Sequence, residues 1–283
     1  MGAATATALQ CSCRPQGCIN DPSCDASCPN TAGGSSVPVV NIAQLQGQPV
    51  FTFDNGATYS GSWQDKCRSG FGIQVWPDGA SYEGNWQDDM AHGHGRFLHA
   101  DGDVYDGEWL CDQAHGKGTY FHKDGSQYTG EWSRDKQHGD GVEAWADGAE
   151  YSGQYVEGHK HGRGNFSWSD GSKYLGDFFE NDIHGHGLYC WNDGRRYEGQ
   201  WVKNGMSGNG SFTWKDGRTY VGEYQNDMKH GRGVFTWPDG RKYVGEWQDG
   251  KQHGKGITYV RDEEPAETTW HHGKPVKVES AAE

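Results

Sequence analysis

Aromatic residues and glycines recur along this chain at a fixed spacing of 23 residues. Nine tyrosines follow this spacing, and each of the nine is followed two residues later by glycine and four residues later by an aromatic residue. These tyrosines are Tyr59, Tyr82, Tyr105, Tyr128, Tyr151, Tyr174, Tyr197, Tyr220 and Tyr243. The spacing contains no insertion or deletion, so the chain is predicted to fold as an array of similar units that stack on their neighbours.

Each unit carries the polarity pattern of a β-hairpin. In residues 233–247 (GVFTWPDGRKYVGEW), aromatic residues and glycines fall on alternate positions on both sides of Pro238-Asp239-Gly240. Because strand side chains alternate between two faces, each half is predicted to be a strand with one aromatic-and-glycine face. Proline presets φ and glycine accepts positive φ, which suits a turn between the strands. The glycines within the strands are expected to leave room for rings that lie over the backbone.

The predicted fold class is all-β, an elongated single-layer array of antiparallel β-hairpins. Residues 46–260 are assigned to nine hairpin repeats, which at two strands each would extend on the order of 85 Å. Residues 1–45 are rich in Ser, Pro, Gly and Cys, carry no period and are expected to form a flexible arm. Residues 261–283 are assigned to a degenerate capping repeat and a tail, because Trp270 still falls on the ring position and the unit could close the open edge.

The repeated motif resembles the MORN (membrane occupation and recognition nexus) repeat. The shared pattern is Tyr-x-Gly-x-Trp, a polar loop, then His-Gly-x-Gly and Asp-Gly, as in YVGEWQDGKQHGKG from Tyr243. The resemblance covers roughly residues 49–260 and implies a MORN repeat rod. It also implies the roles known in that family, which are cytoskeletal and ciliary assembly, extended dimers and phosphoinositide binding.

No constellation of residues indicates catalysis. We find no nucleophile, base and acid that depart from the repeat pattern, and the Gly-x-Gly pairs belong to the repeats and are not followed by a predicted helix. Family members that are lipid kinases or methyltransferases carry a separate catalytic domain, for which this chain has no room outside residues 49–270. The chain is therefore predicted to be a non-catalytic protein without a cofactor.

Charge is distributed unevenly along a chain whose net charge is −14. Residues 54–192 carry ten basic and 23 acidic residues, whereas residues 193–260 carry eleven basic and eight acidic residues. The basic end is a candidate surface for protein partners or anionic lipid, with ordinary solvated surface as the competing interpretation. Its candidate residues are Arg195, Arg196, Lys203, Lys215, Arg218, Arg241 and Lys242. This polarity also makes a homodimer a candidate, whereas nucleic-acid binding is not expected of an acidic chain.

Histidine recurs before the Gly-x-Gly of most repeats, and this histidine column is expected to hydrogen-bond the loop backbone. Successive members should lie ~10 Å apart, too far to share one metal ion. His99 and His122 replace a tryptophan seen in other repeats and are expected to mark a wetter stretch of the aromatic stack. The weak metal candidates are two closer pairs, His92 with His94 and His184 with His186.

The N-terminal segment suggests lipid modification. Gly2 opens a myristoylation-like start, although Ala6 stands where Ser or Thr is preferred. Cys11, Cys13 and Cys18 are candidates for palmitoylation, with zinc ligation or idle thiols as alternatives. The start lacks a basic n-region and an apolar h-region, so a secretory signal is not expected. A reducing, cytoplasmic location follows, in which cysteines are expected as thiols, acylation sites or metal ligands before disulfides.

Three functions remain open from the sequence. The favoured one is a scaffold or adaptor that links other proteins in a cytoskeletal or ciliary assembly. The alternatives are a peripheral membrane tether that binds anionic lipid such as phosphoinositide, and an adaptor for a separate lipid kinase. Net charge favours the scaffold or adaptor over the membrane tether, because an acidic chain is repelled by anionic membranes.

Overall fold

The structure is a computed structural model that describes residues 49–276, and it divides into two compact units that meet in sequence at Ala146 and Asp147. The described residues form strands and turns without a helix, and all their strand pairings are antiparallel, so the predicted all-β hairpin array is confirmed. No helix within residues 49–276 is long and apolar enough to cross a membrane.

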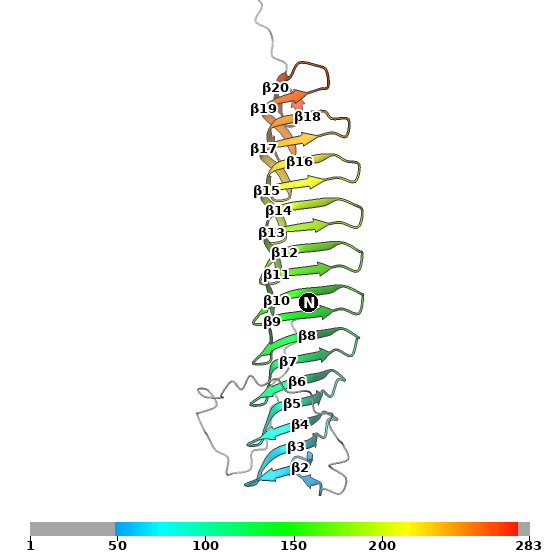
Figure 1. Cartoon of the computed structure of the whole chain (residues 1–283), viewed down its shortest axis with the longest axis vertical. Helices are drawn as coiled ribbons and strands as arrows, with labels where there is room; N and C mark the ends of the chain where they lie inside the picture. Colours follow the sequence, from blue (N-terminus) through cyan, green and yellow to red (C-terminus); the bar gives the residue numbers. More distant parts are fainter. Residues whose placement is uncertain (1–48, 277–283) are drawn as a thin grey trace, which may run out of the picture. The chain divides into compact units, whose positions relative to one another are not determined.

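The first unit is a meander in which each strand pairs with the next along the chain (Figure 1). Its strands are β1 (Phe51–Thr52), β2 (Thr58–Gln64), β3 (Cys67–Val75), β4 (Ser81–Gln87), β5 (Met90–Leu98), β6 (Val104–Leu110), β7 (Gln113–Phe121), β8 (Gln127–Ser133) and β9 (Lys136–Ala144). A seven-residue strand thus alternates with a nine-residue strand after the short β1.

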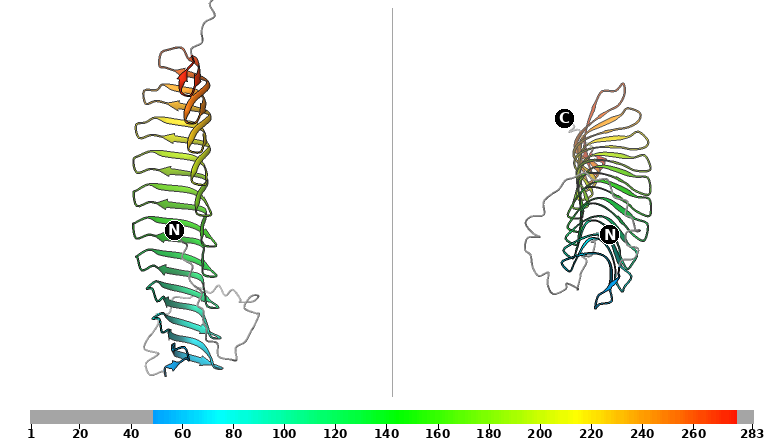
Figure 2. Two further views of the ribbon diagram at one scale, coloured as in Figure 1. Left: turned by 180° about the vertical axis from the view of Figure 1, so that it is seen from behind. Right: turned by 60° about the horizontal axis from the view of Figure 1, so that its bottom comes forward.

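The second unit repeats this alternation from β10 to β19 and ends in a shorter hairpin. Its strands are β10 (Glu150–Val156), β11 (His159–Ser167), β12 (Lys173–Phe179), β13 (Asp182–Cys190), β14 (Arg196–Val202), β15 (Gly205–Thr213), β16 (Thr219–Gln225), β17 (Met228–Thr236), β18 (Lys242–Gln248), β19 (Lys251–Tyr259), β20 (Ala266–His271) and β21 (Lys274–Pro275). Figure 2 shows that, within each unit, the strands lie one above another with turns along both sides.

A wide turn joins each nine-residue strand to the next seven-residue strand, as predicted. In the turn from β17 to β18, Trp237 N–H donates to Arg241 O at 2.9 Å and Gly240 N–H donates to Trp237 O at 2.9 Å. The Asp239 carboxylate accepts Arg241 N–H at 3.1 Å, and Gly240 has a φ of 90°. The Asp-Gly pair therefore closes the turn through a side-chain acceptor and a left-handed glycine.

The polar segment at the other end of each hairpin differs from the predicted loop, because it is a two-residue tight turn. Asn226 and Asp227 both adopt left-handed conformations, with φ of 49° and 65°, and Gln225 pairs directly with Met228. Two consecutive positive φ values define a type I′ turn, which suits the right-handed twist of the flanking strands. The histidine column consequently lies within the nine-residue strands and not at a loop exit.

Most tight turns also bind the strand of the preceding repeat. Asp227 N–H donates to Met206 O at 3.1 Å, and Asp227 Oδ1 accepts Met206 N–H at 2.7 Å. The same reciprocal pair is made by Asp89 on Arg68, Asp112 on Ala91, Asp135 on Ala114, Asn181 on Lys160 and Asn204 on Ile183. We call this pair of hydrogen bonds the clasp. At Gly250, which has no side-chain acceptor, only the backbone hydrogen bond remains, from Gly250 N–H to Lys229 O.

The aromatic core is built from the repeated tyrosines, which are at most 1% exposed. Tyr220 donates its hydroxyl proton to Glu223 O at 3.0 Å. Its ring meets the ring of Tyr224 edge-on at 5.2 Å and that of Trp247 in the next repeat at 5.3 Å. Edge-to-face contact therefore continues from repeat to repeat, and it supplies most of the apolar burial in the array.

The glycines of the repeat serve two physical needs. A Cβ on Gly222 would lie 2.5 Å from the Cα of Gly233, and a Cβ on Gly233 would lie 2.4 Å from the Tyr220 hydroxyl oxygen, so both leave room for the ring as expected. Gly231 instead has a φ of 56° at a β-bulge, where the pairing of β16 with β17 shifts after Gly222.

The C-terminal hairpin covers the last full repeat. β20 pairs with β19, and Trp270 meets the Tyr243 ring at 5.9 Å, on the ring position expected from the sequence. Trp270 Nε1 is buried without a hydrogen-bond partner among the described residues, whereas Trp247 Nε1 donates to Gly233 O. The cap therefore reproduces the ring stack and loses part of its hydrogen bonding.

Candidate functional site

Opposite its aromatic core, the sheet of the second unit exposes a row of aliphatic side chains. Val221 pairs with Val234, Val234 with Val244, and Val244 with Ile257, so the four residues occupy one row across β16 to β19. Val221 is 53% exposed and Val244 is 38% exposed. We call these four residues the apolar strip; the fold does not bury it, although strand alternation explains why it faces away from the rings.

Charged residues flank the apolar strip and complete a shallow groove of about 900 Å³. Arg232 pairs across strands with Glu246, and Lys255 and Glu267 line the same groove. The charges therefore mix both signs around an apolar centre. This composition resembles a protein–protein interface, in which an apolar core is surrounded by a polar rim.

Three of the predicted surface cations are held inside their own wide turns. Arg241 Nε donates to Asp239 Oδ2 at 2.7 Å, and its guanidinium lies 5.4 Å from the Trp237 ring centroid. The Arg241 backbone N–H and guanidinium together lower the pKa of the Asp239 carboxyl. Equivalent contacts hold Arg195 on Asp193 and Trp191, and Arg218 on Asp216 and Trp214. An aspartate therefore neutralises each of these arginines locally.

The other four predicted cations are exposed and lie at both ends of the hairpins. Arg196 and Lys242 begin β14 and β18, and Lys215 lies in a wide turn. Lys203 lies in a tight turn, with a φ of 48°, at the opposite end of its strand from Arg196. The structure therefore does not gather the predicted cations into one patch.

A half-buried lysine beside the core rings was not predicted from the sequence. Lys229 Nζ lies 4.2 Å from the Trp247 ring centroid and 4.8 Å from that of Phe235. Burial, with a smaller contribution from Arg218, lowers the pKa of Lys229 to about 8. Other repeats place residues of varied size here: Arg68, Ala91, Ala114, Gln137, Lys160, Ile183, Met206 and Gln252. The rings enclose the amine, so Lys229 acts as a packing group and a cation–π partner.

His122 lies in a hydrogen-bonded cluster in the first unit. Asp103 Oδ2 accepts the Tyr120 hydroxyl at 3.0 Å and contacts His122 Nδ1 at 3.1 Å, and Asp103 Oδ1 accepts Lys123 N–H at 2.9 Å. Burial raises the pKa of Asp103, but these hydrogen bonds outweigh it and leave the pKa below its ordinary value. Burial lowers the pKa of His99 nearby. A polar cluster thus fills the stretch in which tryptophan is replaced, as expected.

The predicted histidine pairs lie on single strands. His92 and His94 flank Gly93 on β5, and His184 and His186 flank Gly185 on β13. Neither pair belongs to a group of three close metal-ligating side chains within residues 49–276; such a group forms elsewhere, from His253, His271 and His272.

Two histidines of the column lack the predicted hydrogen bond at Nδ1. Nδ1 of His138 and of His253 is buried and has no hydrogen-bond partner in the described part of the chain.

The acylation candidates Gly2, Cys11, Cys13 and Cys18 lie outside the described residues. Among the described cysteines, Cys190 is a free thiol. Cys67 differs from the thiols expected of a reducing compartment because it is disulfide-bonded.

Comparison with solved structures finds distant similarities to centriolar proteins. The Drosophila melanogaster SAS-4 (dCPAP) TCP domain, solved with a proline-rich motif of Ana2, is 12% identical, with a TM-score of 0.35 over 68% of this chain and 99% of that one. The TCP10 domain of Danio rerio CPAP is 14% identical, with a TM-score of 0.31 over 70% of this chain and 94% of that one. Sequence identities and TM-scores this low give no information about the binding partners of this chain. A search of curated proteins finds no match.

Comparison with protein families gives a decisive match. The MORN repeat model matches nine consecutive segments, namely residues 59–81, 82–104, 105–127, 128–150, 151–173, 174–195, 197–217, 220–240 and 243–259. These segments follow the 23-residue period of the tyrosines and the hairpins that they build. The chain therefore belongs to the MORN repeat family.

Proposed function

We propose that this MORN repeat protein is a non-catalytic scaffold that binds partner proteins through the apolar strip within a cytoskeletal or ciliary assembly. The observation that carries the proposal is the row Val221, Val234, Val244 and Ile257 on the face that the core does not use, in which Val221 and Val244 are exposed and the other two are half-buried. Large apolar side chains exposed side by side favour association, because covering them removes apolar surface from water.

The charges around the strip favour a protein over an anionic membrane as the ligand. Arg232 pairs across strands with Glu246, and Lys255 and Glu267 line the same groove, so the rim carries both signs. An anionic lipid surface attracts clusters of one sign, whereas mixed charges fix the register of a protein partner. A partner segment with apolar side chains and alternating charges is the expected occupant.

The experiment compares the full chain with a Val221→Glu/Val244→Glu variant in cells. The wild-type chain is expected to sediment with the detergent-resistant cytoskeleton, and the variant is expected to move to the soluble fraction. Val202→Glu is the matched control, because Val202 is 51% exposed but lies at the end of β14, away from the strip. Thermal unfolding checks that all three proteins are folded. A strip variant that sediments like wild type refutes the proposal.

The membrane alternatives are tested separately. A tether to anionic lipid, or an adaptor for a lipid kinase, relies on the exposed cations Arg196, Lys203, Lys215 and Lys242. If vesicles that contain phosphoinositide bind the wild-type chain, and neutralising these four residues abolishes that binding while the strip variant retains it, the membrane function is favoured instead. The predicted homodimer is tested by light scattering coupled to size-exclusion chromatography.

A further inference from the structure

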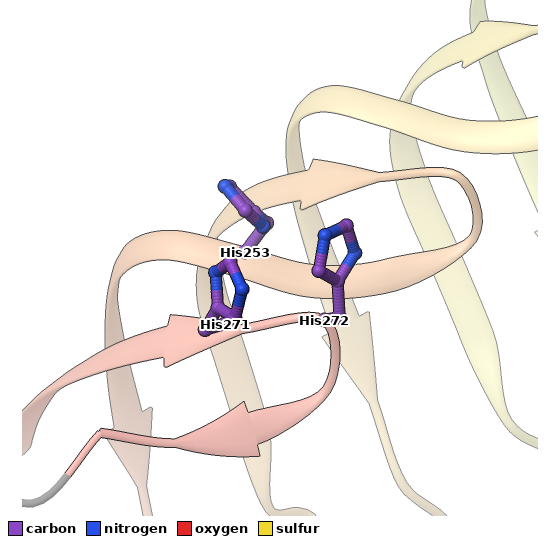
Figure 3. A group of neighbouring side chains, drawn as sticks. All are labelled: His253, His271 and His272. Atoms are coloured by element: carbon purple, nitrogen blue, oxygen red, sulfur yellow. The ribbon is translucent and has the colours of Figure 1, made fainter.

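Three histidines converge at the C-terminal hairpin of the second unit (Figure 3). His253 comes from β19, His271 ends β20, and His272 lies in the tight turn before β21. One ring nitrogen of each can be chosen so that the three atoms lie within 4.8 Å of one another. Their ring centroids are separated by 4.6 to 5.4 Å. Three potential metal ligands from two hairpins therefore meet on one side of the cap.

The repeat geometry explains why the rings meet. His253 is the last member of the histidine column, and the residue that faces such a histidine lies at the end of the next seven-residue strand. In an earlier repeat, His161 faces Phe179 in this way, with ring centroids 5.0 Å apart. At the cap, the facing residue is His271. His272 then occupies the left-handed first position of the tight turn, with a φ of 46°.

We propose that His253, His271 and His272 form a binding site for a divalent transition-metal ion of the zinc class, with water completing the coordination. Zinc–imidazole bonds of about 2.1 Å in a tetrahedral arrangement place ligand nitrogens about 3.4 Å apart. His271 and His272 are exposed, so rotation of their side chains can close the remaining distance at little cost in packing. Three protein ligands and one water form a frequent arrangement for this ion.

The surrounding charges restrict the class of ion. Lys274 pairs across strands with His271, and Lys251 lies beside the turn at Gly273. Two lysines and three imidazoles do not attract Ca²⁺ or Mg²⁺, which prefer carboxylate and carbonyl oxygen. Imidazole suits zinc, nickel and copper, so nitrogen ligation must supply the affinity here.

The buried nitrogen of His253 is consistent with the site but does not carry it. Nδ1 of His253 has no hydrogen-bond partner within the described chain, and Nδ1 of His138 shares that property in a repeat outside the cluster. The distinguishing feature of the cap is the presence of His271 and His272. A bound ion would connect β19 to the hairpin of β20 and β21, and it would thereby fasten the edge of the second unit.

The test measures zinc bound by the full chain, reduced and freed of metal, after equilibration with Zn²⁺ and removal of excess ion. A His271→Gln/His272→Asn variant replaces the cap residues with the Gln225-Asn226 sequence that the chain uses two repeats earlier. This variant is expected to bind one zinc ion fewer than wild type. His230→Ala, which removes a column histidine outside the cluster, is expected to bind as much as wild type. The N-terminal cysteines are the same in all three proteins, so thiol-bound zinc cancels in the comparison.

A transplant provides the second measurement. Gln248→His with Asp249→His places two histidines against His230, in the arrangement of the cap one repeat earlier. The transplanted chain is expected to bind one additional zinc ion. Zinc is also expected to raise the Tm of wild type and to leave that of the His271→Gln/His272→Asn variant unchanged. Equal zinc content in wild type and this variant, or no gain in the transplant, overturns the proposal.

Discussion

Replacing Gly222 by alanine should strongly destabilise the second unit. The added Cβ would lie 2.5 Å from the Cα of Gly233, 2.6 Å from the Arg232 carbonyl oxygen and 2.7 Å from the Tyr220 hydroxyl oxygen. Unstrained carbon atoms approach to about 3.5 Å, so a shift of roughly 1 Å is required. Two of the three obstacles are backbone atoms of the paired strand, which cannot rotate away. We therefore expect a loss of about 3 kcal/mol in the free energy of unfolding, the upper part of the usual range for overpacking.

Gly205→Ala is the matched control for Gly222→Ala. A Cβ on Gly205 would meet its nearest atom, the Val202 carbonyl oxygen, at 3.5 Å, which is an ordinary contact. The same chemical change should therefore alter stability by less than about 0.5 kcal/mol, or stabilise slightly by restricting the unfolded chain. The two variants differ only in the space that the fold gives to one methyl group.

Urea unfolding of the full chain distinguishes these outcomes. With an m-value of about 3 kcal/mol/M, the unfolding midpoint of Gly222→Ala should fall by roughly 1 M, while that of Gly205→Ala should hardly change. Because repeat arrays can unfold in parts, amide hydrogen exchange in β16 and β17 should be followed beside the fluorescence signal. Equal midpoints and equal exchange in the two variants would refute the steric explanation of the repeat glycines.

Three further predictions concern hydrogen bonding and ionisation. Asn204→Ala should lower the free energy of unfolding by about 2 kcal/mol, because Ile183 N–H loses its acceptor at 2.7 Å and because alanine must adopt a φ of 67°. Thermal unfolding of Asn204→Ala and Asn204→Gly, measured together, separates the lost hydrogen bond from the backbone strain. Lys229→Met should stabilise the chain at pH 7 by about 1 kcal/mol after allowance for solvent screening. That gain should shrink as pH rises from about 8 to 10.5, because the folded wild type no longer binds a proton that its unfolded form still holds; paired melts across this range test it. Burial raises the pKa of Tyr59 and Tyr243 to about 12. The stability that these tyrosines contribute is therefore complete below pH 10 and is lost as pH rises toward 12. In a pH titration, tyrosinate absorbance should appear together with unfolding and not before it.

The hairpin fold could be predicted because its determinants are local and repeated. Alternation of glycine and aromatic residues specifies the buried face, and Asp239-Gly240 specifies the wide turn. The tight turn carried a signal that was overlooked, since Asp249-Gly250 between two strands is a strong type I′ pattern. The clasp could not be predicted from one repeat alone, because the carboxylate of Asp227 binds the preceding repeat, 21 residues away.

The candidate surface depended on information that the sequence does not display directly. Val221, Val234, Val244 and Ile257 occupy outward positions that are polar in most other repeats, and only the strand register shows that they form one row. The histidine cluster depended on register as well, because His253 meets His271 only if β20 continues the pairing of the full repeats. Periodicity identifies the core residues, whereas surface residues that depart from the period form a candidate site only together with their neighbours on adjacent strands.

Local ion pairs reduce the positive charge that the second unit presents to solvent. A count along the sequence treats every arginine as available, but Arg241 is held by Asp239 and Trp237 within a single turn, and Arg195 and Arg218 are held in the same way. In each of these turns an aspartate offsets the charge of the arginine. The positive charge that remains for a lipid or a partner comes from the lysines, Arg196 and Arg232. Long-range attraction to an anionic membrane is therefore weaker than the residue count indicates, and the row of exposed aliphatic side chains becomes the stronger candidate for binding.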